Sequence, residues 1–497
     1  MKGIILSAQF LVSILPASLA APAAPIDFNA LNPEWYPVPK SFPSLRHGRG
    51  SNFTGADIRG VKDDPSANYI VILHERENRT WSSIFDDMGF STKEVKQPGR
   101  GFSAHGKDAD HHGYRTFEID DGSRIRAFGT NVRMFSMNML ESEAESMGSL
   151  EYVAAIEKDQ MYYAGVASMS DDVDRSAEYE LQPTEGGEDE VNRRQQDQLV
   201  RQHDTPWNLQ RISSSGRVPP NVGGGPKGLG FDYVYDKSSG AGVDVYMLDT
   251  GFNQHVEFGD RATMEFSAFG LDYMVDDHGH GTHTAGTVGS SRYGVAKGVN
   301  LRGYKVLDSQ NSGSAATILA GLEAALAAHL RRRNNPGFVG SVISMSIGGG
   351  GSQAQFNVLQ RIVNAGMHVA ISAMNDNTDA CRMFPGGYST QLPIFNVGAT
   401  DINDNRASFS NYGPCVNIQA PGVDIVSTSN ENPRGTRVLT GTSMACPAVS
   451  GLIAVEMVKY PQLRLDPQAM RGHIQSLALN GMIRGAPQVL LNNGVQR

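Results

Sequence analysis

Three short motifs in the 497-residue chain carry an Asp, a His and a Ser that could act together on a substrate. Asp249 begins the triplet Asp-Thr-Gly, His280 lies within Gly-His-Gly-Thr-His, and Ser443 lies within Gly-Thr-Ser-Met-Ala. A serine hydroxyl becomes a nucleophile when an imidazole takes its proton, and a buried carboxylate fixes the tautomer of that imidazole. The motifs therefore predict nucleophilic catalysis, with Ser443 as nucleophile, His280 as base and Asp249 as the orienting group.

The elements around these motifs alternate between strand-like and helix-like runs. Strands are expected at 243–248, 339–347, 367–373 and 394–397, and helices at 314–330, 353–365 and 442–460. Such alternation predicts an α/β fold, a mostly parallel sheet with helices on both faces. Sites in these sheets form beyond the carboxyl ends of strands. Asp249 directly follows the first of these strands, and His280 and Ser443 stand at expected helix starts.

Each motif alone has another interpretation. Asp-Thr-Gly also occurs in aspartic proteases, but those enzymes need two such carboxylates and the chain has one such triplet. The Ser443 motif approaches a nucleophile elbow, but its last residue is not Gly, and that class places its acid and His after the Ser. His278, His280 and His283 could also form a metal cluster, so the metal content is left open.

Taken together, the motifs resemble the subtilisin family, nearest to its proteinase K-like branch. The segments Ala373-Met374-Asn375 and Ser346-Ile347-Gly348-Gly349 belong to this resemblance, which runs from about Trp207 to the C-terminus. The resemblance implies a subtilisin-like fold and a secreted serine endopeptidase that hydrolyses peptide bonds in proteins and is made as a zymogen. It departs from the family at Ala448, where a His is usual, and this departure and Met374 leave open an inactive homologue that acts as a binding protein.

The resemblance also assigns roles around the triad. Asn375 would donate its side-chain amide to the oxyanion beside the Ser443 backbone N–H. The substrate backbone would pair with Gly313, Ser346, Ile347 and Gly348. Ala373 and Met374 would line the pocket for the residue before the scissile bond. Met374 stands where the family has Gly. If the Met374 side chain points into the pocket, it would favour small or medium substrate residues. If it points into the core, it would change the substrate preference little.

The region before the triad divides into four zones. Residues 1–20 have the charged start, apolar run and small-residue end of a secretory signal peptide. Residues 21–65 form a loose leader, and residues 66–163 a small α+β unit that resembles the family's inhibitory propeptide. Its strands are expected at 69–73 and 153–156, and its helices at 80–88 and 142–147. Residues 164–204 are expected to be an acidic linker with a processing site at Arg193-Arg194, and 205–497 the catalytic domain.

Composition limits the partners. Apolar residues make up 40% of the chain and charged ones 19%, as in ordinary globular proteins, and the net charge of −9 argues against a nucleic-acid-binding surface. No apolar stretch after the signal peptide could span a membrane, so we expect an extracellular monomer. Its expected partners are protein and peptide substrates and its own propeptide. Asn52-Phe-Thr and Asn78-Arg-Thr match glycosylation acceptors.

Cofactor and cysteine expectations follow from the same resemblance. The chemistry requires no cofactor, and Asn417 replaces an Asp that binds calcium in proteinase K, which weakens the expectation of a structural calcium site. Related proteins have cysteines in the contexts of Cys381 and Cys415, so we expect these two to form a disulfide. Cys446 would then remain free, about one helical turn after Ser443.

Overall fold

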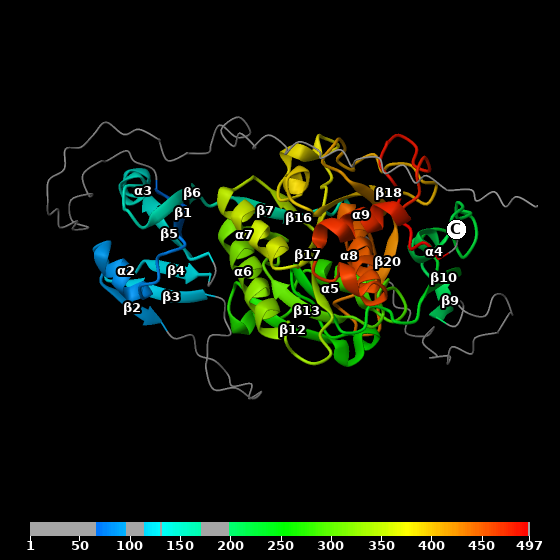
Figure 1. Ribbon diagram of the computed structural model, residues 1–497, viewed down its shortest axis with the longest axis horizontal. Coiled ribbons are helices and arrows are strands. Elements are labelled where there is room, and N and C mark those ends of the chain that lie inside the picture. The colour runs from blue at the N-terminus through cyan, green and yellow to red at the C-terminus, as the bar shows by residue number, and fades with distance from the viewer. Residues whose placement is uncertain (1–65, 96–113, 130–131, 170–197, 496–497) are drawn as a thin grey trace, which may run out of the picture.

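The computed structural model describes residues 66–95, 114–129, 132–169 and 198–495 (Figure 1). The expected signal peptide, the leader, the acceptor Asn52 and the pair Arg193-Arg194 lie outside the described residues. No helix in the described ranges has both the length and the apolar character needed to cross a bilayer.

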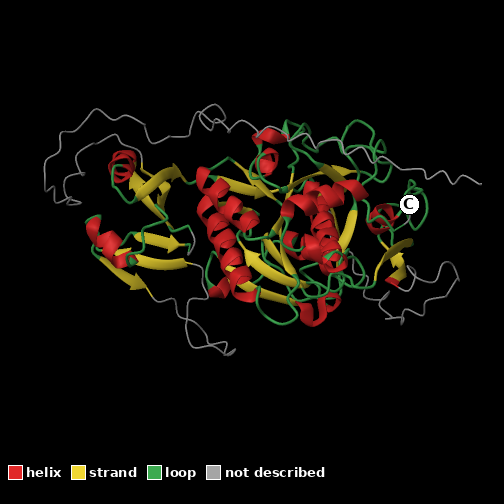
Figure 2. Ribbon diagram, in the orientation of Figure 1, coloured by secondary structure: helices red, strands yellow, loops and turns green. Residues whose placement is uncertain are grey.

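A seven-stranded parallel sheet forms the centre of the C-terminal unit, so the expected fold class is confirmed (Figures 1 and 2). Adjacent strands pair in parallel along the whole sheet. In spatial order the strands are β12 (Ala262–Ser267), β13 (Asn300–Lys305), β11 (Val243–Asp249), β15 (Gly340–Met345), β17 (His368–Ser372), β18 (Phe395–Thr400) and β19 (Ile418–Pro421).

Helices cover both faces of this sheet. Successive side chains of a strand point to opposite faces, and β11 shows the result: Tyr246 and Leu248 pack into one apolar cluster and Val245 and Met247 into another. The first cluster includes α6 (Ala315–Arg332) and α7 (Gln353–Asn364), and the second includes α5 (His280–Gly289), α8 (Thr442–Lys459) and α9 (Pro467–Leu477). Each face of the sheet therefore has its own core. The edge of the sheet between the two cores can carry a functional site.

Smaller elements complete the C-terminal unit. Two antiparallel pairs are β9 (Leu199–Thr205) with β10 (Phe231–Asp236), and β20 (Ile425–Thr428) with β21 (Thr436–Thr440). The short helix α4 (Trp207–Ser213) precedes β10, and the 3-10 helices are η3 (Val256–Arg261), η4 (Leu271–Tyr273), η5 (Ala380–Arg382), η6 (Gly386–Thr390) and η7 (Pro461–Leu463). The expected strand at 339–347 is divided, because the chain leaves the sheet after Met345 and begins β16 (Ile347–Gly349).

The N-terminal unit is a six-stranded antiparallel sheet with two helices, whereas the sequence predicts an α+β unit with the same two helical regions and only two of these strands, 69–73 and 153–156. Its strands in spatial order are β2 (Thr92–Val95), β3 (Tyr114–Ile119), β4 (Arg124–Phe128), β5 (Met134–Leu140), β1 (Ser66–Leu73) and β6 (Val153–Lys158). The helices are α2 (Trp81–Asp87) and α3 (Glu141–Gly148), and they pack with the sheet in a separate apolar cluster.

The other face of this small sheet lies against the C-terminal unit. Tyr69 and Val71 of β1 belong to the small unit's own core, whereas Ile70 and Ile72 join the cluster that contains α6 and α7. Figure 1 accordingly places the blue and cyan unit beside these two helices. The carboxylate of Glu157 also accepts hydrogen bonds from Ser352 Oγ at 2.5 Å and Ala354 N at 3.2 Å, at the start of α7.

The segment that leaves the small unit differs from the expected linker. Residues Met161–Ala164 form β7, which pairs antiparallel with β14 (Ser312–Ser314) on one side and β16 on the other. Residues Ser168–Met169 form β8, which pairs with β21. At the other end of the expected linker, β9 already belongs to the C-terminal unit. These segments are too short to show a periodic pattern in the sequence. They are strands because they pair with strand edges far away in the sequence.

Candidate active site

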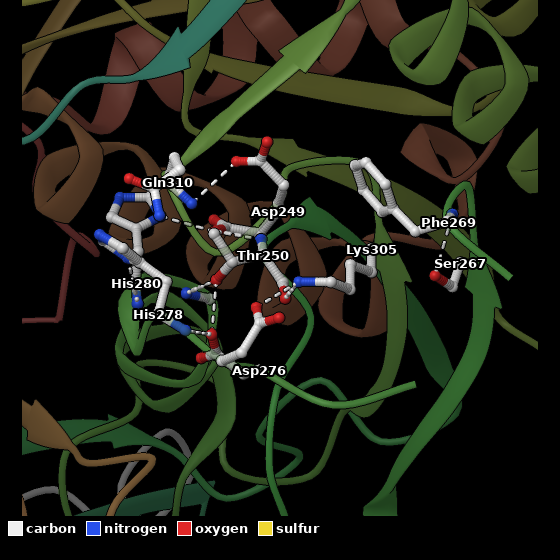
Figure 3. Close-up of polar contacts among 12 residues, drawn as sticks. Asp249, Thr250, Ser267, Phe269, Asp276, His278, His280, Lys305 and Gln310 are labelled. Carbon is white, nitrogen blue, oxygen red and sulfur yellow. Dashed lines mark hydrogen bonds and ion pairs between the residues drawn. The ribbon is translucent and has the colours of Figure 1, made fainter. Parts of the chain in front are cut away.

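Asp249 and His280 are brought together by the end of β11 and the start of α5. His280 Nδ1 lies 2.6 Å from Asp249 Oδ1, and both side chains are buried (Figure 3). Because a carboxylate only accepts, Nδ1 is the protonated nitrogen when the imidazole is neutral, and Nε2 carries the lone pair. The approach of the helix to the strand requires Gly281, because a Cβ there would lie 1.9 Å from the Gly251 carbonyl oxygen.

Further donors hold the Asp249 carboxylate in place. The Thr250 backbone N–H donates to Oδ1 at 2.7 Å, and the Thr284 hydroxyl donates to Oδ2 at 3.0 Å. Asp249 therefore has partners on both oxygens besides His280. No motif in the sequence marks Thr284, although its position four residues after His280 puts it on the same helix face, which is the signal that could have identified it.

Asp276 organises the loop that leads into α5. Its Oδ1 accepts from the Thr250 hydroxyl at 2.8 Å and the Gly279 amide at 2.7 Å, and its Oδ2 accepts from Thr282 Oγ1 at 2.6 Å (Figure 3). These bonds tie the residues after Asp249 to the residues around His280. Asp276 carries no motif signal in the sequence, because its bond to Thr250 joins two segments that meet only in the fold.

Ser443 is the second residue of α8. Its hydroxyl donates to the Ser346 carbonyl oxygen at 3.3 Å, while His280 Nε2 is buried with no partner in the described ranges. The Ser443 backbone N–H donates at 3.1 Å to the carbonyl oxygen of Gly165, a residue that follows β7. The amide of the expected nucleophile is therefore already bound to a peptide carbonyl from the chain's own N-terminal part.

Asn375 lies beside this amide with one end fixed. Its Oδ1 accepts from the Thr442 amide at 3.0 Å and the Thr442 hydroxyl at 2.9 Å. Its Nδ2 is buried and has no hydrogen-bond partner among the described residues. A buried donor without a partner is unfavourable unless a ligand satisfies it. This arrangement suits the expected oxyanion role, and Thr442, which the sequence analysis missed, orients the amide.

The expected substrate-binding residues line the path of β7. Gly313 in β14 lies opposite Tyr162, Gly348 in β16 lies opposite Tyr163, and Ile347 lies opposite Ala164. The Ser346 carbonyl accepts from the Gly165 amide at 3.1 Å. The structure therefore gathers these four residues along one extended segment, as the resemblance implies for a substrate backbone.

The Met374 side chain lies in the cleft, and Ala373 behind it is buried. A Cβ added to Gly348 would lie 2.4 Å from Met374 Cγ, and one added to Gly165 would lie 3.2 Å from its sulfur. Met374 also has φ of 74°, a left-handed conformation that a side chain makes unfavourable by about 1–2 kcal/mol. Strained residues of this kind are concentrated at functional sites.

The three cysteines form one disulfide and one free thiol. Cys381 and Cys415 form a disulfide with Cα atoms 5.2 Å apart. Cys446 is free and fully buried in α8, and burial raises the pKa of its thiol to about 12. It therefore remains a neutral thiol at ordinary pH.

The three histidines do not form a metal cluster in the structure. Burial lowers the pKa of His283 to about 3, so its ring is neutral, and its Nε2–H donates to the Ile425 carbonyl at 2.9 Å. His278 is half-buried, which also lowers its pKa. Throughout the described ranges, no three His, Cys, Asp or Glu side chains are grouped to hold a metal ion. The Asn417 side chain instead accepts from the Asn396 amide at 2.8 Å.

Comparison with known proteins agrees with this arrangement. Residues 240–494 match the family described as the subtilase family. The chain is 38% identical over 296 residues to "Subtilisin-like serine protease pepC" of Aspergillus niger, which covers 57% of this chain and 54% of the relative. It is also 38% identical over 296 residues to "Alkaline protease 2" of Aspergillus fumigatus, covering 57% and 58%. The chain thus spans about half the length of the curated relatives it matches.

A solved structure is similar as well. The "Crystal structure of a cold adapted subtilisin-like serine proteinase" superimposes with a TM-score of 0.51 and 33% identity, and the match covers 58% of this chain and 98% of that one. The parallel sheet, the bonded Asp249–His280 pair and a family match over half of the sequence lead to one conclusion: the chain belongs to the subtilase family.

Proposed function

We propose that this chain is a serine endopeptidase that hydrolyses peptide bonds through an acyl-enzyme on Ser443. The observation that carries the proposal is the 2.6 Å bond between His280 Nδ1 and Asp249 Oδ1, which leaves Nε2 buried and unpartnered in the described structure. Subtilisin-like proteases among its relatives support the same activity. The proposed chemistry uses only side chains, backbone amides and water.

The proposed mechanism begins with a rotation of the Ser443 hydroxyl. The hydroxyl turns from the Ser346 carbonyl towards His280 Nε2, which takes its proton as Oγ attacks the substrate carbonyl carbon. Asp249 stabilises the imidazolium that forms. The same proton then passes to the leaving amine, and a water molecule repeats the sequence to release the acyl group.

The negative charge on the substrate carbonyl oxygen would be stabilised by two donors. The Ser443 N–H already binds a carbonyl oxygen at 3.1 Å, and Asn375 Nδ2 is the free donor beside it. The start of α8 adds the positive end of a helix dipole. Such donors contribute most when they are fixed before the charge develops, and Thr442 fixes Asn375.

We further propose that the protein is exported as a self-inhibited zymogen. Residues 66–163 would be the inhibitory propeptide, because this unit packs on α6 and α7 and sends β7 between β14 and β16 in the cleft. Export is supported by the signal-like residues 1–20 and by the Cys381–Cys415 disulfide, since disulfides persist outside the reducing cytosol.

A fluorophosphonate probe, which reacts with an activated serine, tests the activity. We expect it to label the processed protein at Ser443 and not to label Ser443→Ala or His280→Ala, with each variant at least about 10⁶-fold slower on casein, the magnitude known for subtilisin, a member of the same family. Folding of each variant is checked by circular dichroism. A processed protein that stays unlabelled and inert would instead identify an inactive homologue that binds peptides.

A further inference from the structure

The chain passes through the candidate active site without a break. On one side, β7 pairs with β14 and β16, and the Gly165 amide donates to the Ser346 carbonyl at 3.1 Å. On the other side, the Ala167 amide donates to the Thr440 carbonyl at 2.8 Å, and β8 continues the pairing along β21. Residues 161–164 and 168–169 are therefore held as short strands on the two sides of Ser443, and residues 165–167 join them through a tight turn in which the Val166 amide donates to the Ala164 carbonyl at 3.0 Å.

The backbone contacts identify the peptide bond at the reacting atoms. The Gly165 carbonyl oxygen accepts the Ser443 N–H at 3.1 Å, and the direction of the Gly165 side chain would bring a Cβ to 3.0 Å from Ser443 Oγ. Gly441 lets the segment approach, because a Cβ there would lie 2.3 Å from the same carbonyl oxygen. The carbonyl of Gly165 is thus the one that Ser443 faces, and the bond that follows it joins Gly165 to Val166.

The position of Gly165 leaves little room for a side chain. A Cβ would meet Ser443 Oγ and Thr442 Oγ1 at 3.0 Å each and the Met374 sulfur at 3.2 Å, so a methyl group requires only small shifts. A longer side chain must displace Met374. About 600 Å³ of the cleft stays open beside the segment, lined in part by Met383 and Phe409, and the flexible sulfur has space to move. Large residues are therefore disfavoured rather than excluded.

Tyr162, three residues before Gly165, is the buried anchor of the segment. Its ring is fully buried, and its hydroxyl donates to the Gly350 carbonyl and lies 3.4 Å from Gln355 Oε1. Tyr163 next to it is 53% exposed, as strand alternation requires. Burial of an aromatic ring provides much of the binding energy that a peptide can gain. Tyr162 is therefore a second point of recognition in this segment, besides the residue at the bond.

We propose that the chain first cuts itself between Gly165 and Val166, and that Met374 makes the enzyme prefer Gly or Ala before the scissile bond with an aromatic residue three positions earlier. This inference rests on the proposed function. Ser443 Oγ bonds to the Gly165 carbonyl carbon while its proton moves to His280 Nε2 and on to the Val166 nitrogen as the C–N bond breaks. Water then hydrolyses the ester, giving a carboxylate at Gly165 and restoring Ser443.

Processing of the full chain tests the bond. We expect mass spectrometry to find an N-terminal fragment that ends at Gly165, and Ser443→Ala to stay uncut. Replacing Arg193 and Arg194 by Ala should leave this fragment unchanged. A first fragment that ends elsewhere, for instance after Arg194, overturns the assignment of the bond.

A second-site pair tests Met374. Gly165→Phe should slow processing about 10-fold, the lower end of what one pocket contact discriminates, because the sulfur can move. Met374→Gly in the same chain should restore the rate. Asn377→Gly is the matched control, since Asn377 also has a positive φ, 50°, but lies outside the pocket; it should not restore processing. Equal rates for Gly165→Phe and the native sequence overturn the role of Met374.

Peptides test the preference in trans. The processed enzyme is given Met-Tyr-Tyr-Ala-Gly-Val-Ala-Ser with a quenched fluorophore, and versions with Ala, Leu or Phe in place of Gly. We expect kcat/KM to be about 10-fold lower for Phe, and a peptide lacking the first Tyr to be cut more slowly than one lacking the second. Labelled, active enzyme that prefers Phe refutes this inference alone, whereas an unlabelled, inert protein refutes the proposed function.

Discussion

Single residues explain how the site is assembled. The Asp249 carboxylate holds His280, Thr250 and Thr284 at once, so its position is fixed from three directions. A carboxylate with this many donors has little freedom to rotate. Asp249 therefore fixes the orientation of the imidazole, with Nδ1 towards Oδ1 and Nε2 directed away from it.

Asn375 gives the first prediction at this scale. Its Nδ2 has no partner among the described residues, whereas its Oδ1 has two donors. Asn375→Ala removes the free donor, so kcat should fall about 10²- to 10³-fold, the range known for the corresponding donor in subtilisin. KM should change little because the donor acts on the oxyanion. Steady-state kinetics on a peptide substrate measure both constants, and an unchanged kcat would exclude the oxyanion role.

The sequence predicts a set of reacting residues, but it does not reveal the side chains that hold them in place. Asp249, His280 and Ser443 stand in motifs whose residue types are dictated by the chemistry. Thr442 and Asp276 act through contacts between distant segments, so no local pattern marks them. The direction of Met374 is also invisible in the sequence, because it depends on how the segment before Asn375 packs against β16.

Elements set the distances between those residues. The end of β11 and the starts of α5 and α8 meet at one edge of the parallel sheet, and the first amides of both helices donate to nearby side chains or, for Ser443, to the Gly165 carbonyl. The segment 372–375 continues from the end of β17 to the same edge. The site therefore depends on the packing of α8 against the sheet and on the loops that carry Asp276 and Asn375.

The disulfide gives a prediction at the scale of elements. Cys381 lies in η5 and Cys415 lies 34 residues later, just before β19, so the bond closes a loop that includes η6 and β18. Replacing both by Ser should lower the free energy of unfolding by about 3–4 kcal/mol in the chain-entropy model. Urea unfolding of the Ser443→Ala protein avoids self-digestion. Cys446→Ser is the control, and equal loss in both variants would argue against the loop effect.

Long periodic elements were predictable and short ones were not. The sequence places α6, α7 and α8 within a few residues of their observed ends, because each has an extended apolar pattern. It misses β7 and β8 and treats residues 164–204 as a linker. These strands have four and two residues, and their stability comes from pairing with edges more than 140 residues away.

At the scale of the whole molecule, the small N-terminal unit and the C-terminal unit share a core. One face of the antiparallel sheet packs with α2 and α3, and the other packs on α6 and α7. The small unit also places Asp159 at the start of α6, where its Oδ1 accepts the Ala316 amide at 3.1 Å. Carboxylates at helix starts are stabilised by the helix dipole.

Glu157 allows the interface to be tested. A separately made fragment of residues 66–165 should inhibit the processed enzyme, and Glu157→Ala should weaken inhibition about 10- to 100-fold, because Ser352 and Ala354 lose a buried carboxyl acceptor. Glu151→Ala is the matched control, since Glu151 is exposed. The inhibition constants are measured on a fluorogenic peptide. A fragment that does not inhibit would show that the unit serves another purpose.

The pairing of β7 on both of its edges has a consequence for a population of molecules. The cut that we propose after Gly165 would not break the hydrogen bonds of β7 to β14 and β16, so the severed strand would still occupy the cleft and the molecule would stay inhibited. The cleft would then be freed only when the severed piece is degraded. An enzyme molecule that has already lost its own severed piece could degrade it. In a culture, proteolytic activity should therefore appear slowly at first and then accelerate. The lag should shorten as the protein becomes more concentrated.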